Sequence, residues 1–305
     1  MTPPQETSIA QSRAPGQRNS TAPGSRLRRT WRRPRLRSTL TSLVLFPICF
    51  VWIYPFLWML SAGLKTEREI YSGLGLIPDS LLWENYSRAW TVARIGEYFV
   101  NTVIVTLGSI AIVLISVSLM GYVLGRFQFP GKKAVIAVFA VTIFLPEGYT
   151  IIPIVELLQK LNLTNSLAGV TLAQSGGAHV VMVLLFAGYF SQLPKELEEA
   201  AVVDGASFFR VFWEIMLPLA KPVIATTIIL QFMASWNAFL QPLVLTLSRP
   251  DLRTLAVGIY AFRGEYSTDW SGMAAASTIS LAPIIIVFLF LQRYFIEGIA
   301  GSVKS

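Results

Sequence analysis

The residues of this sequence that could take part in chemistry are mostly neutral and lie inside long apolar segments. They are Gln174, Gln231, Trp236, Asn237 and Gln241. A tryptophan ring beside an amide can stack on a sugar and hydrogen-bond to its hydroxyl groups, and hydrocarbon penalises polar groups left without a partner. The pattern favours a path for an uncharged, hydroxyl-rich molecule, although asparagine and glutamine also hold membrane helices together.

Two titratable side chains, Glu147 and His179, also lie in apolar segments. A charge at the centre of a bilayer costs about 2.5–3.5 kcal/mol on insertion scales, so such residues often mark ion coupling or a substrate path. Glu147 fits a cavity on a substrate path and a pairing role at the membrane surface equally well, whereas packing is the commoner role for His179. So few titratable groups make an ion-coupled secondary transporter the weaker alternative.

The sequence lacks the patterns that catalysis or ATP binding would require. It contains no G-x-x-x-x-G-K-[ST] phosphate-binding loop. One histidine and one cysteine, Cys49, are too few for a His/Cys metal cluster or an intrachain disulfide, and no motif supports a serine nucleophile. We expect a chain that is not an enzyme and that holds no metal or cofactor of its own.

The composition indicates an integral membrane protein. Of the 305 residues 53% are hydrophobic and only 14% are charged, which is too apolar for a soluble globule. The net charge of +8 comes largely from nine arginines within the first 37 residues. Residues 1–37 are also rich in proline, serine and glycine, so we predict a disordered basic tail on the cytoplasmic side and no binding of nucleic acid.

Apolar stretches of about 20 residues, enough to cross roughly 30 Å of hydrocarbon, predict an all-α protein with six transmembrane helices within residues 38–305. The predicted spans are approximately 40–62, 98–122, 134–153, 167–190, 223–247 and 273–291. The first is too long for the apolar core of a signal peptide and is expected to remain uncleaved. Gly121 and Gly125, four residues apart, predict close helix packing.

The positions of lysine and arginine predict the orientation. The basic tail and the short connector with Arg126, Lys132 and Lys133 mark two cytoplasmic sides, and two spans separate them. Both termini and the polar segment 194–222 then lie in the cytoplasm. The connector 63–97 lies outside and is long enough to form a small structured cap.

The segment 194–222, hereafter the 194–222 loop, has the pattern of two short helices. Pro194 and three glutamates suit a helix start, and Gly205 can end that helix without strain. Five apolar residues then recur at the spacing of one helix face, and two prolines end the second helix. The apolar residues are Phe208, Val211, Phe212, Ile215 and Leu219, and the prolines are Pro218 and Pro222.

The 194–222 loop resembles a known motif. The residues Glu199-Ala200-Ala201, then three residues, Gly205, nine residues, and Ile215-x-Leu217-Pro218 match the EAA loop of bacterial ABC importer permeases. Asp204 fits the carbohydrate-importing branch. The segments LKTEREIY, ENYSRAW and RFQFPGKK are similar to corresponding segments of maltose-type permease subunits, so the resemblance covers most of the chain after residue 38.

This resemblance implies a type I ABC importer permease fold in a bacterial cytoplasmic membrane. It implies a homologous second permease, two ATPase subunits that bind the ATP and Mg²⁺, and an extracytoplasmic solute-binding protein, with lipid around the spans. The imported solute would be a sugar or oligosaccharide, or alternatively glycerol-phosphate or another polyol. The expected ATPase-coupling residues are Glu199, Ala200, Ala201, Asp204, Gly205, Phe208, Phe209, Phe212, Leu217 and Pro218. The substrate path would take in Gln174, Trp236, Asn237 and Gln241, with Glu147.

Overall fold

The computed structural model describes residues 35–144, 147–177, 179–264 and 267–302, and these form helices joined by loops, with one isolated β-bridge between Arg263 and Thr268. The predicted tail, residues 1–37, lies almost wholly outside the described residues. The described residues fall into two units, and the division lies between Phe50 and Val51 within the first helix. The helical fold class is therefore confirmed.

Three helices are long and apolar enough to cross a membrane on their own: α1 (Arg35–Ala62), α4 (Ile95–Arg126) and α15 (Trp270–Ser302). Two bent pairs also reach that length. In one, α7 (Leu167–Ser175) and α8 (Val180–Gln192) meet at 57°. In the other, the helical turns from Phe208 to Leu219 meet α12 (Lys221–Trp236) at 81°. The described residues thus contain up to five spans by length and composition.

The predicted span 134–153 is not one continuous helix. Here α5 (Lys132–Thr142) ends early, and the short turn η1 (Glu147–Thr150) leads into α6 (Ile151–Lys160). Pro153 lies in the first turn of α6, where a proline needs no N–H, and Pro146 precedes η1 outside the described residues. The predicted span 223–247 is also interrupted, because α12 ends at Trp236. The count of six spans stays a prediction.

The predicted cap, residues 63–97, is structured. It contains α2 (Glu67–Ser72) and α3 (Glu84–Thr91). The buried Asn85 amide donates hydrogen bonds to the carbonyl oxygens of Gly63 (3.2 Å) and Lys65 (3.0 Å), which fastens α3 to the end of α1. The remaining elements are α9 (Glu196–Val203), α10 (Phe208–Arg210), η2 (Val211–Met216), α11 (Leu217–Leu219), α13 (Leu240–Leu245), η3 (Pro250–Leu252) and α14 (Leu255–Tyr260).

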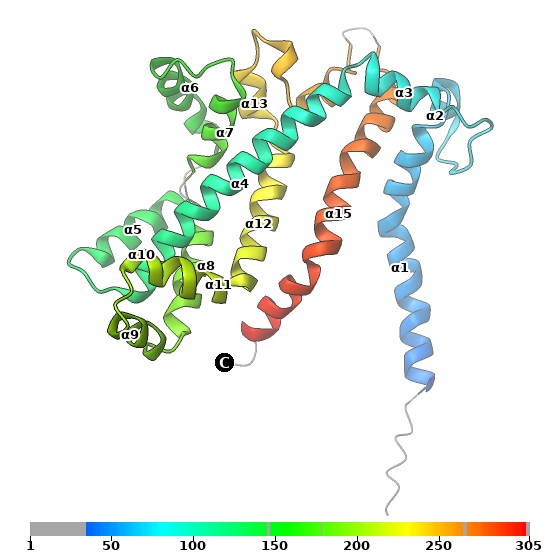
Figure 1. Cartoon of the computed structure of the whole chain (residues 1–305). Coiled ribbons are helices and arrows are strands. Elements are labelled where there is room, and N and C mark those ends of the chain that lie inside the picture. Colours follow the sequence, from blue (N-terminus) through cyan, green and yellow to red (C-terminus); the bar gives the residue numbers. More distant parts are fainter. Residues whose placement is uncertain (1–34, 145–146, 178, 265–266, 303–305) are drawn as a thin grey trace, which may run out of the picture. The chain divides into compact units, whose positions relative to one another are not determined.

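Helix α4 runs from the cap to the 194–222 loop, and all three apolar cores include residues from it (Figure 1). Gly121 and Gly125 confirm the predicted close packing, because a Cβ at either position would lie 2.3 Å from Phe186 Cβ or 2.6 Å from the Ala187 carbonyl oxygen of α8. The backbones of α4 and α8 therefore approach as closely as glycine allows.

Candidate functional site

The first arm of the 194–222 loop is α9, and it ends as the sequence predicts. Gly205 adopts a left-handed conformation with φ +82°. Its N–H donates to the Val202 carbonyl (3.0 Å), and the next N–H, of Ala206, donates to the Ala201 carbonyl (2.9 Å). These two bonds form a Schellman motif, which satisfies the last carbonyls of the helix and turns the chain sharply.

The second arm is a helix wound in three ways. Ser207 begins it by accepting a hydrogen bond from the Arg210 N–H (3.4 Å). The turns then widen from α10 into the π-helix η2 before returning to α-helix in α11. Such widened turns are rare and occur mostly at functional positions. The apolar spacing predicts a regular helix here, and nothing in it indicates a π-helix.

The loop has one buried and one exposed face. Val211, Phe212 and Met216 are buried in the core shared with α4 and α8. On the exposed face Val203 is 86% exposed and Phe209 is 62% exposed. The exposed face also holds Glu199, Ala200, Val202, Asp204, Phe208, Trp213 and Pro218.

The burial separates the predicted coupling residues into two groups. Ala201 and Phe212 are buried, and Leu217 is half-buried, so these three side chains support the loop from inside. The prediction that Phe212 belongs to an exposed docking face is therefore corrected. Phe212 lies against Tyr122 of α4, with ring centroids 5.4 Å apart, and this core contact takes up its ring.

Arg126, the last residue of α4, attaches the loop to the helices. Its Nε donates to Glu198 Oε2 of α9 at 2.9 Å, in an ion pair whose side chains are only 4% and 19% exposed. Its other nitrogens donate to backbone carbonyls at the end of α8. These are Nη1 to Phe190 (3.3 Å) and Leu193 (2.7 Å), and Nη2 to Pro194 (3.3 Å).

Tyr122, one helical turn before Arg126, provides an aromatic attachment for the second arm. Its ring lies 5.3 Å from Phe208 and 5.4 Å from Phe212, measured between centroids. Tyr189 of α8 adds a hydrogen bond from its hydroxyl to the Leu219 carbonyl (2.8 Å) at the end of that arm. These attachments were not predicted from the sequence. The arginine of the RFQFPGKK segment, a cation at the end of a predicted span, was the one residue that could have indicated them.

Trp236 and Asn237, two of the residues predicted for a substrate path, make contacts within the protein. Trp236 is buried, stacks on Phe232 at 5.2 Å, and donates from Nε1 to the Ser280 carbonyl (3.1 Å). One face of its ring is thus already covered by protein, which corrects the expectation of a free stacking surface. Asn237 is exposed but turns its amide back to the Met233 carbonyl (2.8 Å), and Gln241 is half-buried.

Gln174 belongs to a buried polar cluster, residues 106, 109, 174, 231 and 235, between α4, α7 and α12. Ser235 donates to Gln174 Oε1 and receives a hydrogen bond from Ser109 at 3.1 Å. Gln231 donates to the Gln174 backbone carbonyl (3.4 Å). Among the described residues, Gln174 Nε2 and Gln231 Oε1 find no partner. The contacts favour the helix-joining role over an open path.

The two titratable candidates lie in different elements. Glu147 begins η1, and its side chain lies outside the described residues. His179 precedes α8 with φ +41°, and its Nε2 lies 3.2 Å from the Ser175 carbonyl oxygen, which bridges the break between α7 and α8. Within the described residues no three carboxylate, histidine or cysteine side chains gather as a metal site would require.

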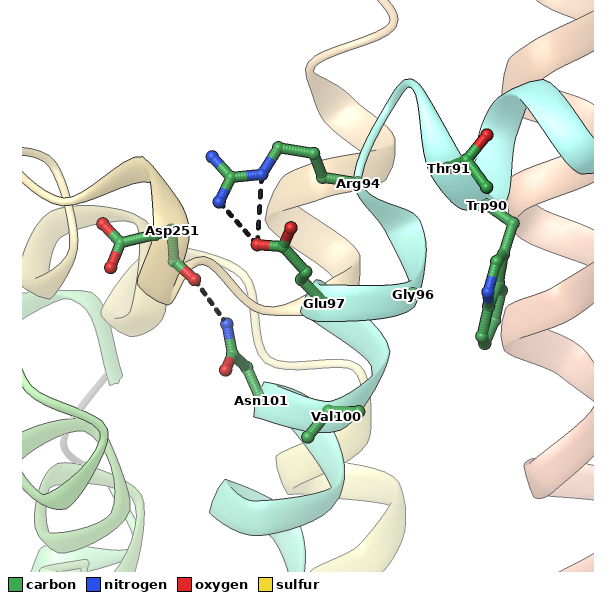
Figure 2. A pocket seen from close by; sticks show the side chains of 8 residues that line it. All are labelled: Trp90, Thr91, Arg94, Gly96, Glu97, Val100, Asn101 and Asp251. Atoms are coloured by element: carbon green, nitrogen blue, oxygen red, sulfur yellow. Dashed lines mark hydrogen bonds and ion pairs between the residues drawn. The ribbon is translucent and has the colours of Figure 1, made fainter.

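An open pocket of about 680 Å³ lies at the other end of α4 (Figure 2). It is lined by Trp90, Thr91, Arg94, Gly96, Glu97, Val100, Asn101 and Asp251. The charged residues of the lining are Arg94, Glu97 and Asp251. The hydrogen bond from Arg94 to Glu97 raises the pKa of Arg94, and the hydrogen bond from Arg249 lowers the pKa of Asp251. None of the residues predicted to contact substrate lies in this pocket.

A family model described as the inner membrane component of binding-protein-dependent transport systems matches residues 117–301, more than half of the chain and the whole of the 194–222 loop. The matched segment therefore contains both arms of the loop, the whole of α8 and the end of α4 that carries Tyr122 and Arg126.

Curated relatives align over most of the chain. The diacetylchitobiose uptake system permease protein of Streptomyces coelicolor is 34% identical over 254 residues, 83% of each chain. A probable starch degradation products transport system permease protein of Thermoanaerobacterium thermosulfurigenes is 32% identical and covers 90% of this chain and 100% of that protein. The sn-glycerol-3-phosphate transport system permease protein of Yersinia pestis is 31% identical, with 86% and 92% covered.

A solved structure shares the fold. It is a bacterial ABC transporter involved in the import of the acidic polysaccharide alginate, with a TM-score of 0.73 over 87% of this chain and 98% of that one. At 22% identity the likeness concerns the fold.

Proposed function

The chain belongs to the family of inner membrane components of binding-protein-dependent transport systems, and on that premise we propose that its 194–222 loop receives the motion of a cytoplasmic ATPase. It is a multi-pass permease subunit of an ABC importer. The loop would transmit nucleotide-driven closure to the membrane helices and so switch the importer between its two access states.

The two faces of the loop carry this proposal. One face is built into the core with α4 and α8, while the other exposes a large apolar surface at Val203, Phe208 and Phe209 beside the acidic groups of Glu199 and Asp204. Exposed apolar patches rimmed by charge are typical of protein-binding surfaces. We propose that a groove on the ATPase receives this face and that its basic groups bind the two carboxylates.

The partners and the orientation follow from the same proposal. The loop must lie in the cytoplasm, where ATP is available, and both termini then lie there too, in agreement with the lysines and arginines of the short connector at 126–133. A homologous second permease and two ATPase subunits would complete the importer, and an extracytoplasmic binding protein would deliver the solute.

A sugar or oligosaccharide is the proposed solute. Curated relatives are named for diacetylchitobiose, starch degradation products, and melibiose, raffinose and stachyose. Glycerol-phosphate or another polyol is the alternative, because a relative named for sn-glycerol-3-phosphate is nearly as similar.

Affinity purification from the native membranes tests the central contact. The tagged chain should retain an ATPase in mild detergent, and Glu199→Lys should reduce the amount retained because it reverses a charge on the docking face. Glu196→Lys, on the same helix but outside the motif, serves as the matched control. A wild-type chain that retains no ATPase would contradict the proposal.

Uptake by cells tests the solute. Cells that carry the chain should accumulate at least one of radiolabelled maltose, raffinose, diacetylchitobiose and glycerol-3-phosphate, and a deletion strain should not. Uptake should stop when ATP is depleted and continue when the proton gradient is collapsed. The reverse pattern would indicate a secondary transporter instead.

A further inference from the structure

Arg126 joins three parts of the chain that are distant in sequence. It ends α4, donates a hydrogen bond to the Glu198 carboxylate of α9, and donates to the carbonyls at the end of α8. A cation at a helix end that presents free carbonyls is stabilised by the helix dipole. One guanidinium therefore fixes the position of α9 relative to both α4 and α8.

Glu198 has little freedom to act elsewhere. Its Oε2 binds Arg126, and its Oε1 is buried without a hydrogen-bond partner among the described residues. A buried carboxylate is costly unless a cation compensates it, so α9 is held where that cation lies. Glu196 and Glu199, on the same helix, are exposed. Glu198 thus differs from its neighbours in facing inward.

The helices that receive this attachment form a closely packed pair. Gly121 and Gly125 bring the backbone of α4 against that of α8 in the turns just before Arg126. Tyr122, in the same stretch, holds the second arm through Phe208 and Phe212. Both arms of the loop are consequently attached to one tightly packed helix pair.

We propose that Arg126 and Glu198 are the positioning residues that make α9 move together with the α4–α8 pair when the ATPase closes. The inference rests on the proposed function of the loop and adds the residues through which its motion reaches the membrane helices. Without the ion pair, α9 would follow the ATPase while α4 and α8 lag behind.

Distances between two spin labels test this joint movement in the full transporter complex. Cys49 is the single cysteine of this chain, so a Cys49→Ser background leaves no other labelling site in it, and the partner chains are used in cysteine-free form. Labels at Lys195→Cys, at the start of α9, and Leu107→Cys, on an exposed face of α4, report the separation of the two helices. The separation is measured without nucleotide and after trapping with ATP and vanadate.

With the native ion pair, the distance should be the same in both states. Glu198→Ala, which favours helix and so keeps α9 folded, should make the distance shift on trapping by roughly one helical turn, about 5 Å. Glu198→Gln, which keeps a hydrogen-bond acceptor, should restore part of the native behaviour. Glu196→Ala is the matched control and should behave as the native chain does.

The outcomes separate the two proposals. If the native chain retains no ATPase, the proposed function fails. If the complex forms and hydrolyses ATP but Glu198→Ala keeps the native distance in both states, the ion pair does not position α9 and the inference alone is overturned. A Glu198→Ala complex with the same shifted distance in both states would show only a structural role and would also overturn it.

Discussion

The two ends of α4 carry the same pair of residue types in opposite surroundings. At its start, Arg94 binds Glu97 at 2.5 Å, and the two side chains are 44% and 55% exposed. At its end, Arg126 binds Glu198, and those side chains are nearly buried. The first pair joins residues three apart in one helix, whereas the second joins residues 72 apart and also binds three carbonyls.

This difference indicates which end of α4 is attached firmly enough to be moved by a bound partner. An exposed pair exchanges readily with water and contributes little to stability. A buried pair that has lost one partner leaves an uncompensated charge, so the groups it joins are costly to separate. The end of α4 at the 194–222 loop is therefore the end that can follow a partner's movement.

Arg126→Met tests the comparison with the largest expected effect. It leaves the Glu198 carboxylate buried without its cation and should lower the free energy of unfolding by about 3–5 kcal/mol. Arg94→Met, at the other end of the same helix, should leave it unchanged within error. Denaturant unfolding of the purified chain followed by tryptophan fluorescence measures both, and equal effects would mean that the two ends do not differ.

Gly205→Val tests whether the turn between the arms matters for coupling. Valine in the left-handed conformation costs about 1–2 kcal/mol, so the protein should still insert while the arms lose their relative orientation. Uptake of radiolabelled sugar should fall about tenfold, the change that 1.4 kcal/mol produces in an equilibrium. Gly131→Val imposes the same strain at φ +88° outside the loop and should keep uptake near normal. Equal losses in both variants would remove the special role of Gly205.

Ser235→Ala tests the polar cluster midway along α4, where neutral hydrogen bonds replace the ion pair. The change removes the donor to Gln174 and the acceptor for Ser109, and it should cost about 0.6–1.7 kcal/mol. Ser116→Ala is the control, since the Ser116 hydroxyl donates only within its own helix. If the free energy of unfolding is unchanged and solute binding is weaker, Gln174 belongs to the substrate path instead.

The Glu69 carboxylate in the cap has the smallest expected effect on stability, and this effect depends on pH. Backbone N–H groups of Thr66 and Asp79 donate to this carboxylate at 2.7 Å each, and they lower its pKa below the ordinary value of 4.5. The stabilisation is therefore present above pH 4.5 and is lost as the pH falls through the lowered pKa. The protection of residues 66–79 against hydrogen exchange, taken relative to the intrinsic rate at each pH, should fall in that acidic range.

Glu69→Gln should abolish this pH dependence, because an amide does not titrate there. If the variant's protection still falls in the same acidic range as the native chain's, another group controls the cap.

The sequence was sufficient for the features that depend on local spacing. Gly205 ends α9 as predicted, the glycine pair at 121 and 125 packs α4 on α8, and the cap at 63–97 is structured. Each of these depends on residues a few positions apart, where helix geometry and turn chemistry leave few alternatives.

Features that depend on distant contacts could not be predicted in the same way. No local pattern shows that Arg126 meets Glu198, which lies 72 residues further along the chain. The stacking of Phe232 on Trp236, four residues apart on α12, follows helix spacing and was overlooked. Phe212 shares its face with Val211 as the spacing predicts, but helix spacing does not show that this face packs against α4 and α8 instead of a partner. The break in the helix within 134–153 was not predicted, because average hydropathy does not register where a proline interrupts a helix.

Cysteine labelling tests most directly whether the 194–222 loop lies on the ATPase side of the membrane. In the Cys49→Ser background, Lys195→Cys in α9 and Ile77→Cys in the cap, both exposed, are treated with a membrane-impermeant maleimide. We predict that intact cells label position 77 and not 195, and that inside-out vesicles label 195 and not 77. Labelling of position 195 in intact cells would place the loop outside, where no cytoplasmic ATPase could reach it, and would contradict the account.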